Sequence, residues 1–187
     1  MKAQESGAGV PEFAKSEHLR RRARSNIEPG AMNATYRGDR AAVLGFLNAA
    51  LATKIVCVLR YRHHHFMARG LASRRTAEEF LVHSDEELSH ADLLAERIVQ
   101  LGGEPDFSPA TLTQRSHAEY VPASSIVEMI KENLVAERIA IDSYRGLIAY
   151  IGEDDPTTRR MLEGILGVEE AHAEELAELL QGDMRGK

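Results

Sequence analysis

The sequence predicts an all-α protein, a four-helix bundle with a long crossover between helices two and three, plus a short N-terminal helix. Apolar residues recur at spacings of three and four along four long stretches, which is the period of a helix with one buried face. Only 5% of the 187 residues are aromatic and six are Pro, a composition typical of helices rather than strands. The length suits one domain with a substantial core.

We expect an N-terminal arm with a short helix over residues 1–30 and the bundle domain over residues 31–187. The arm begins with a Gly- and Ala-rich segment, and its short amphipathic helix is expected at about residues 12–25. The long helices are expected at about residues 40–69, 74–101, 123–151 and 156–181.

Start and stop signals support these boundaries. Gly70 follows the first long helix, and glycine is the usual residue just past a helix end. Ser125 and Glu128 form the pattern of a capping box at the start of the third helix. The fourth helix should begin with Asp155 as its N-cap and Pro156 in its first turn.

Residues 102–122 form the longest predicted connection and contain Pro105 and Pro109. The other two connections between long helices are short. This order is expected for two helix hairpins joined by a crossover that runs along the bundle.

Each inward stripe carries ionisable residues near its middle, where a helix bundle is normally apolar. They are Lys54 on the first helix, Glu87 and His90 on the second, Glu137 on the third, and Glu169 and His172 on the fourth. A buried carboxylate is costly unless a partner or a metal ion compensates it. Bundles that bind two irons use two Glu-x-x-His pairs and a Glu from each remaining helix, so the pattern predicts a di-iron site with one ligand replaced by a cation.

An internal repeat supports this interpretation. Tyr61 follows Lys54 by seven residues, and Tyr144 follows Glu137 by the same interval. A Glu-x-x-His pair comes later in each half, so only Lys54 breaks the symmetry. The two tyrosines either hydrogen-bond the site carboxylates without binding the metal themselves, or their rings simply fill space in the bundle.

Three segments resemble the bacterioferritin and Dps-like branch of the ferritin-like superfamily: LNAALATKIVCVLRYRHHHFMARG, EELSHADLLAERIVQLGGEPDF and LVAERIAIDSYRGLIAYIGEDDPTTRRMLEGILGVEEAHAEEL. The resemblance covers about residues 16–181. It implies a four-helix bundle that forms homo-oligomers, from dimers to cages of 12 or 24 subunits, and that oxidises Fe(II) for iron storage or detoxification.

The resemblance also implies a role for each site residue. Glu87 and Glu169 would bridge two irons, and Glu137 would be a terminal ligand. His90 and His172 would each bind one iron. The first helix should supply a glutamate where this chain has Lys54, and residues 40–77 contain no Asp or Glu that could replace it. Haem is not expected, because Leu88 stands where haem-binding relatives carry methionine.

Charge suggests what Lys54 does. Three carboxylates and one ammonium balance one divalent ion, whereas four carboxylates would balance two. We therefore expect an ion pair from Lys54 to Glu87 or Glu169, at most one well-held ion near Glu137, Glu169 and His172, and reduced or lost ferroxidase activity. In the alternative arrangement Lys54 extends away along its helix and a water replaces the missing ligand.

Other histidines and acids invite weaker interpretations. Adjacent residues of a helix point about 100° apart, so His63, His64 and His65 cannot chelate one ion together. His65 is expected to be hydrogen-bonded near the bundle end. His83 is either an accessory ligand on the entry side or a satisfied core residue. Exposed acids on the fourth helix are expected to form a solvated face or a cage lining; they are Glu174, Glu175 and Glu178.

Two further function classes stay open. One is a structural or DNA-protecting assembly with a vestigial metal site, in which a basic arm makes weak DNA contact although the net charge is −6. The basic residues of the arm are Lys15, Arg20, Arg21, Arg22 and Arg24. The arm could instead pack on a neighbouring subunit. The other class is a mononuclear or manganese-containing oxidase, because these ligands do not select among iron, manganese and zinc.

The sequence also predicts a location. No run of about 18 apolar residues and no hydrophobic signal segment is present, so no membrane association is expected. The single cysteine, Cys57, excludes an intrachain disulfide and fits a reducing compartment. We therefore expect a soluble, cytoplasmic protein.

Overall fold

The computed structural model describes residues 11, 13, 15–25, 27, 28, 30, 32–68 and 73–185. All regular elements in these residues are helices, which confirms the predicted fold class. The chain divides into two units, Met1–Tyr36 and Arg37–Lys187, and each is considered by itself. The Gly- and Ala-rich start of the arm and the predicted helix stop at Gly70 lie outside the described residues.

Among the described residues of the first unit, one α-helix is present, α1 at Ser16–Arg24. It is shorter than predicted, because Lys15 has extended backbone angles and ends the helix on its N-terminal side. No residue of α1 is buried within the described chain. The amphipathic pattern that predicted the helix is therefore not explained by packing among the described residues of its own unit.

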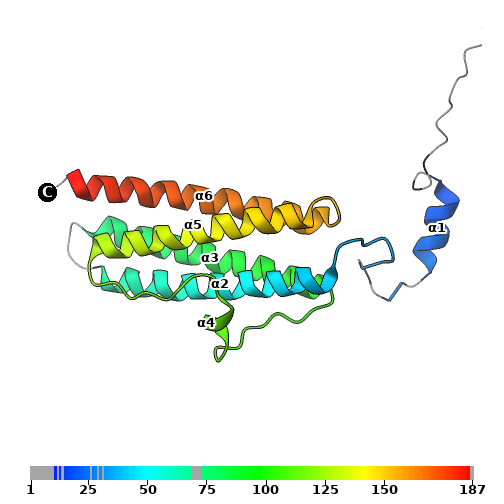
Figure 1. Cartoon of the computed structure of the whole chain (residues 1–187), viewed down its shortest axis with the longest axis horizontal. Coiled ribbons are helices and arrows are strands. Elements are labelled where there is room, and N and C mark those ends of the chain that lie inside the picture. The colour runs from blue at the N-terminus through cyan, green and yellow to red at the C-terminus, as the bar shows by residue number, and fades with distance from the viewer. Residues whose placement is uncertain are drawn as a thin grey trace, which may run out of the picture. The chain divides into compact units, whose positions relative to one another are not determined.

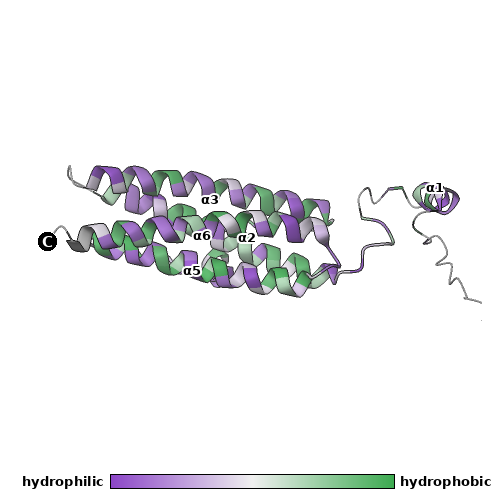
Figure 2. Cartoon of the chain, turned by 90° about the horizontal axis from the view of Figure 1, so that it is seen from above, coloured by the Kyte–Doolittle hydropathy of each residue, from purple (hydrophilic) through white to green (hydrophobic). Residues whose placement is uncertain are grey.

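The second unit is built from four long helices, which lie alongside one another (Figure 1). They are α2 at Arg40–Met67, α3 at Arg74–Gln100, α5 at Ile126–Ile151 and α6 at Pro156–Arg185. Helix α2 packs mainly on α3, and α5 mainly on α6, so the bundle consists of two hairpins. Apolar residues recur along each long helix (Figure 2), and those that face inward form the core.

The two helices of the second hairpin, α5 and α6, begin with side-chain caps near the predicted positions. The Ser125 hydroxyl accepts a hydrogen bond from the Glu128 amide at 3.3 Å. The Glu128 carboxylate returns to the Ser124 amide at 3.1 Å, one residue before the position that a capping box would use. At the start of α6, Asp155 accepts from the Thr158 amide at 2.9 Å, as an N-cap should.

The crossover runs from the end of α3 to the start of α5, from one end of the bundle to the other (Figure 1). It contains a short helix that the sequence did not reveal, α4 at Leu112–Arg115. Four residues are too few to show helical periodicity. Leu112 is buried against Ala52 and Val56 of α2, and this contact holds the crossover on the bundle.

Two buried polar residues of α2 also hold the crossover. Arg60 donates to the Glu119 carbonyl oxygen at 2.8 Å and to Asn133 Oδ1 at 3.1 Å. His64 lies 2.9 Å from the Val121 carbonyl oxygen. These bonds satisfy polar groups that would otherwise be costly to bury, and they fix α2 against α5 next to the site layer.

Helix α2 is long and apolar enough to cross a membrane if only length and composition are considered. Half of its most apolar window is buried inside the bundle, and the helix carries the buried charges of Lys54 and Arg60. A core helix of a bundle accounts for this composition.

Candidate metal centre

The six ionisable residues singled out in the sequence meet in one layer inside the bundle. Each long helix contributes at least one, and none is more than 7% exposed. They are Lys54 from α2, Glu87 and His90 from α3, Glu137 from α5, and Glu169 and His172 from α6. The helical period and the two-hairpin topology place them there, because spacing three keeps both members of each Glu-x-x-His pair on the inward face.

Lys54 lies between two carboxylates. Its Nζ is 2.6 Å from Glu87 Oε2 and forms a second, shorter ion pair with Glu169 Oε2. Burial alone would lower the pKa of Lys54, but the surrounding carboxylates, Glu87 first among them, raise it well above its ordinary value. Lys54 is therefore an ammonium ion in the centre of the site. The alternative in which it extends away along the helix does not occur.

His90 adds a second positive group next to the same carboxylates. Its Nδ1 lies 3.0 Å from Glu169 Oε1 and 3.8 Å from Glu87 Oε2. Burial opposes the charge on this ring, yet the two carboxylates raise the pKa of His90 to about 9. Burial would likewise raise the pKa of Glu169, but Lys54 and His90 hold it below its usual range. Without a metal ion, Lys54 and His90 thus compensate Glu87 and Glu169.

Glu137 has a different environment. Burial, followed by the charges of Glu87 and Glu169, raises the pKa of Glu137 well above its ordinary value. The Tyr61 hydroxyl donates a hydrogen bond to Glu137 Oε1. Tyr61 therefore adopts the first of its two expected roles, as a partner of a site carboxylate.

Tyr144 does not mirror Tyr61. Its hydroxyl is buried and has no hydrogen-bond partner among the described residues. Its ring centre lies 5.4 Å from Lys54 Nζ, so the ring offers its face to the ammonium. The internal repeat is broken here as well, because the hydroxyl of Tyr144 does not bind a carboxylate while Lys54 occupies the expected ligand position.

The donor atoms fit a divalent metal ion. One oxygen or nitrogen each from Glu87, Glu137, Glu169 and His172 lies within 4.8 Å of the others. Of the eight buried side-chain atoms without a hydrogen bond in the described chain, six belong to these four residues and His90. Carboxylates with imidazole suit iron, manganese or zinc. Three of the six atoms, Glu87 Oε2, His90 Nδ1 and Glu169 Oε1, lie in ion pairs with Lys54 or with each other. A metal ion could bind the convergent oxygens and nitrogens of the group.

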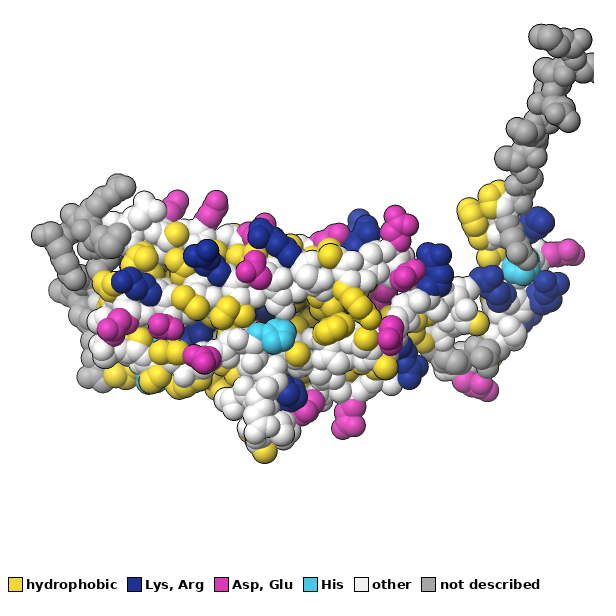
Figure 3. All heavy atoms as spheres, viewed as in Figure 1, with side chains coloured by type: hydrophobic (Ala, Val, Ile, Leu, Met, Phe, Trp, Pro, Cys, Tyr) yellow, Lys and Arg dark blue, Asp and Glu magenta, His cyan; other side chains and the backbone are white. Residues whose placement is uncertain are grey.

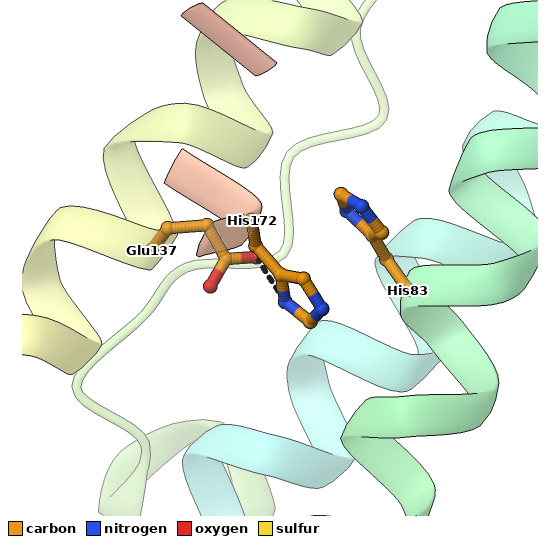
Figure 4. A group of neighbouring side chains, drawn as sticks. All are labelled: His83, Glu137 and His172. Atoms are coloured by element: carbon orange, nitrogen blue, oxygen red, sulfur yellow. Dashed lines mark ion pairs between the residues drawn. The ribbon is translucent and has the colours of Figure 1, made fainter. Parts of the chain in front are cut away.

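Other residues contact the centre, and sequence reasoning missed some of them. His172 Nε2 lies 2.7 Å from Glu86 Oε2, and His83 Nε2 lies 3.0 Å from Glu175 Oε2. The rings of His83 and His172 are stacked with centroids 4.0 Å apart, and His83 projects from α3 toward Glu137 and His172 (Figure 4). Glu86 precedes the predicted ligand Glu87 and lies beside the inward stripe, so the helical period gave it no role.

Glu175 is half exposed, as expected for a residue of a solvated face, and its carboxylate also contacts the buried His83. The flexible glutamate side chain makes this contact possible from the edge of the helix. His65 is hydrogen-bonded near the bundle end as expected, with Nδ1 2.6 Å from the Ala77 carbonyl oxygen.

Comparison with known proteins agrees with this geometry. Residues 44–185 match the ferritin family, described as a ferritin-like domain. A bacterioferritin of Desulfovibrio desulfuricans is 28% identical over 73% of this chain and 73% of its own length. A nutrient stress-induced DNA-binding protein of Synechococcus is 32% identical over 73% of this chain and 80% of its own.

A solved structure has the same fold. It is described as a dodecameric thioferritin, the bacterioferritin-related protein of Bacteroides fragilis. The similarity has a TM-score of 0.76 and 28% sequence identity, and it covers 79% of this chain and 89% of that one. The family match over residues 44–185 includes parts of all four helices that supply the site residues.

Proposed function

Because this chain belongs to the ferritin-like family, we propose that it binds iron at an altered dinuclear centre that holds one divalent ion and has little or no ferroxidase activity. One observation carries the proposal. The ammonium of Lys54 contacts both Glu87 and Glu169, the two carboxylates that would otherwise be shared between two ions.

The charge of the site supports one ion rather than two. With its histidines counted as neutral, the site offers three carboxylates and one ammonium, a formal charge of minus two, which one divalent ion neutralises. A second divalent ion would place uncompensated positive charge in a buried layer, where charge is poorly screened. Lys54 thus takes over the electrostatic role of one metal ion.

The remaining donors define where the ion would bind. Glu137, Glu169 and His172 are the proposed ligands, and Glu87 is within reach of the same position. Tyr61 would orient the Glu137 carboxylate through its hydrogen bond. Iron is the proposed cargo because relatives of this chain are bacterioferritins; the ligands themselves would also accept manganese or zinc.

Oxidation should be weak for a simple reason. Transfer of two electrons to dioxygen or peroxide is favoured when two irons are held a few ångströms apart by shared carboxylates. Here both candidate bridging carboxylates are engaged by Lys54. The chain would therefore bind or store Fe(II) without fast turnover at this centre.

Metal occupancy tests the proposal directly. Crystals loaded with Fe(II) without oxygen, or with Mn(II), should show one anomalous scattering peak per chain in this layer, near Glu137, Glu169 and His172. Data from a calcium-loaded crystal, measured at the same wavelength, are the control that shows which anomalous signal is specific to the transition metal. Two fully occupied transition-metal peaks beside Lys54 would contradict a single-ion centre.

A homo-oligomer is proposed as well. The solved relative from Bacteroides fragilis is described as dodecameric, and this chain shares its bundle over 79% of the sequence. The exposed apolar side chains of the bundle include Phe46 and Tyr150, whose rings contact each other edge to face. Such side chains are candidates for a contact with a second copy.

A DNA-protecting assembly is the second candidate, and the surface of α1 favours it. The basic side chains of the arm gather around this helix, whereas acidic and basic groups mix on the visible face of the bundle (Figure 3). Lys15 and the four arginines are all exposed, and a DNA-binding relative is 32% identical to this chain. An array of arginines can bind phosphates without reading sequence.

Salt-dependent gel retardation of duplex DNA tests this second function. Arg20, Arg21 and Arg22 are changed together to Gln in one variant and to Lys in a matched one. The Gln variant should lose retardation and the Lys variant should keep most of it, since the phosphate contact depends on charge. Binding that persists after deletion of residues 1–25 would exclude α1 as the DNA contact.

A further inference from the structure

A second cluster of ligand groups lies outside the buried centre, between α3 and α6. It consists of Glu79, His83 and Glu175, with one donor atom of each within 4.8 Å of the others. His83 Nε2 is 3.0 Å from Glu175 Oε2 and 3.7 Å from Glu79 Oε1. Donor atoms at these separations can surround one ion whose bonds to nitrogen and oxygen are about 2.0–2.2 Å long.

One side chain of this cluster is held in place by packing, and the other two are free to change conformation. His83 is fully buried, and Glu79 lies one helical turn before it on α3. Glu175 approaches from α6. The side chains of Glu79 and Glu175 are 33% and 51% exposed, so they can adjust around an ion that arrives from solvent.

The hydrogen bonds around His83 leave one ring nitrogen facing the carboxylates. The Tyr61 hydroxyl donates its proton to Glu137, so Tyr61 can only accept from His83 Nδ1, which lies 3.3 Å away. In the neutral ring the proton is then on Nδ1, and Nε2 carries a lone pair. That lone pair and two carboxylate oxygens converge on one point, where one metal ion could bind all three.

We propose that Glu79, His83 Nε2 and Glu175 bind a divalent transition-metal ion, Fe(II) in the iron-handling role, as a station from which the buried centre is loaded. Two carboxylates neutralise one divalent ion, and imidazole with carboxylates is a donor set that such ions accept.

The surroundings give an ion access to this station. Glu79 and Glu175 line a surface pocket of about 620 Å³, together with Glu178. The pocket lies where α3 and α5 begin and α6 ends. Arg75 also lines the pocket, but three carboxylates against one guanidinium leave the wall negative, and this raises the local concentration of cations.

Overlapping ligand groups connect the station to the buried centre. His83 also forms a group with Glu137 and His172, and these two residues in turn belong to the group with Glu87 and Glu169. Figure 4 shows the middle group, with the His83 ring facing His172 and Glu137. An ion could therefore move inward while keeping at least one ligand at each step. This transfer rests on the proposed function, whereas binding at the surface does not.

Titration of metal-free, full-length protein with Co(II), followed by its visible absorption and by metal analysis after gel filtration, tests the station. The wild type should bind two ions per chain, and Glu79→Gln combined with Glu175→Gln should bind one. The matched control changes Glu96 and Glu174 to Gln; both are exposed, one on each helix, and neither belongs to the cluster. Equal ion numbers in the wild type and the Glu79/Glu175 variant would overturn the proposal.

A Glu137→Gln variant separates this proposal from the one for the buried centre. It should lose the buried ion and keep the surface ion. If it loses an ion while the Glu79/Glu175 variant loses none, the station is wrong and the buried centre stands. If only the Glu79/Glu175 variant loses an ion, the station stands and the buried centre is wrong.

The rate of loading tests the transfer. In the Glu79/Glu175 variant, Co(II) should reach the buried centre at least about tenfold more slowly, with the same final occupancy there, because a tenfold change needs only about 1.4 kcal/mol of added barrier. The Glu96/Glu174 control should load at the wild-type rate. An unchanged rate in the Glu79/Glu175 variant would overturn the transfer.

Discussion

Replacing Lys54 with glutamate is expected to raise the rate of Fe(II) oxidation at least about tenfold, a change of about 1.4 kcal/mol in the activation barrier. The substitution removes the ammonium that contacts Glu87 and Glu169 and supplies the carboxylate missing from α2. The site then has four carboxylates and two Glu-x-x-His pairs, the donor set that holds two irons in helix bundles. Stopped-flow absorbance after mixing with Fe(II) and oxygen measures the rate.

A Lys54→Gln variant is the control for this experiment. It removes the same positive charge but adds no carboxylate, so its oxidation rate should rise less than that of the Glu variant. The Glu variant should also bind one more divalent ion per chain than the wild type. Equally fast oxidation by the wild type and the Glu variant would refute the assignment of Lys54 as the residue that disables the centre.

The sequence predicted best those elements in which apolar residues repeat with the helical period over many residues. The stripes at spacing three and four predicted the four long helices and brought Glu87, Glu137 and Glu169 into one layer, because each helix buries a single face. Short elements lack such a signal. Helix α4 spans four residues and depends on the contact of Leu112 with α2, which is remote in sequence.

The groups around the centre were harder to predict for a related reason. Glu86 and Glu175 lie beside the inward stripes, and their flexible side chains reach histidines on another helix. Such contacts depend on how two helices face each other, which periodicity within one helix does not specify. The different hydroxyl environments of Tyr61 and Tyr144 show the same limit, since their positions in the internal repeat are equivalent.

Replacing Lys54 with methionine is expected to destabilise the metal-free protein by about 3–5 kcal/mol, the usual effect of removing one partner from a buried ion pair. Lys54 is fully buried, and its loss leaves Glu87 and Glu169 with His90 as their remaining positive neighbour. Methionine has a similar length and is apolar, so packing changes little while the charge disappears. Urea unfolding in the presence of a chelator, at a fixed protein concentration, measures the difference.

Metal ions should reverse this effect. Without Lys54 the three carboxylates attract a divalent ion more strongly, and a free ion concentration of about 100 times its dissociation constant adds about 2.7 kcal/mol to stability. Lys131→Met, on the exposed side of α5, should change stability by no more than about 0.5 kcal/mol. If Lys54→Met costs as little as this surface control, the ammonium does not compensate the buried carboxylates, and the argument that it stands in for a metal ion fails.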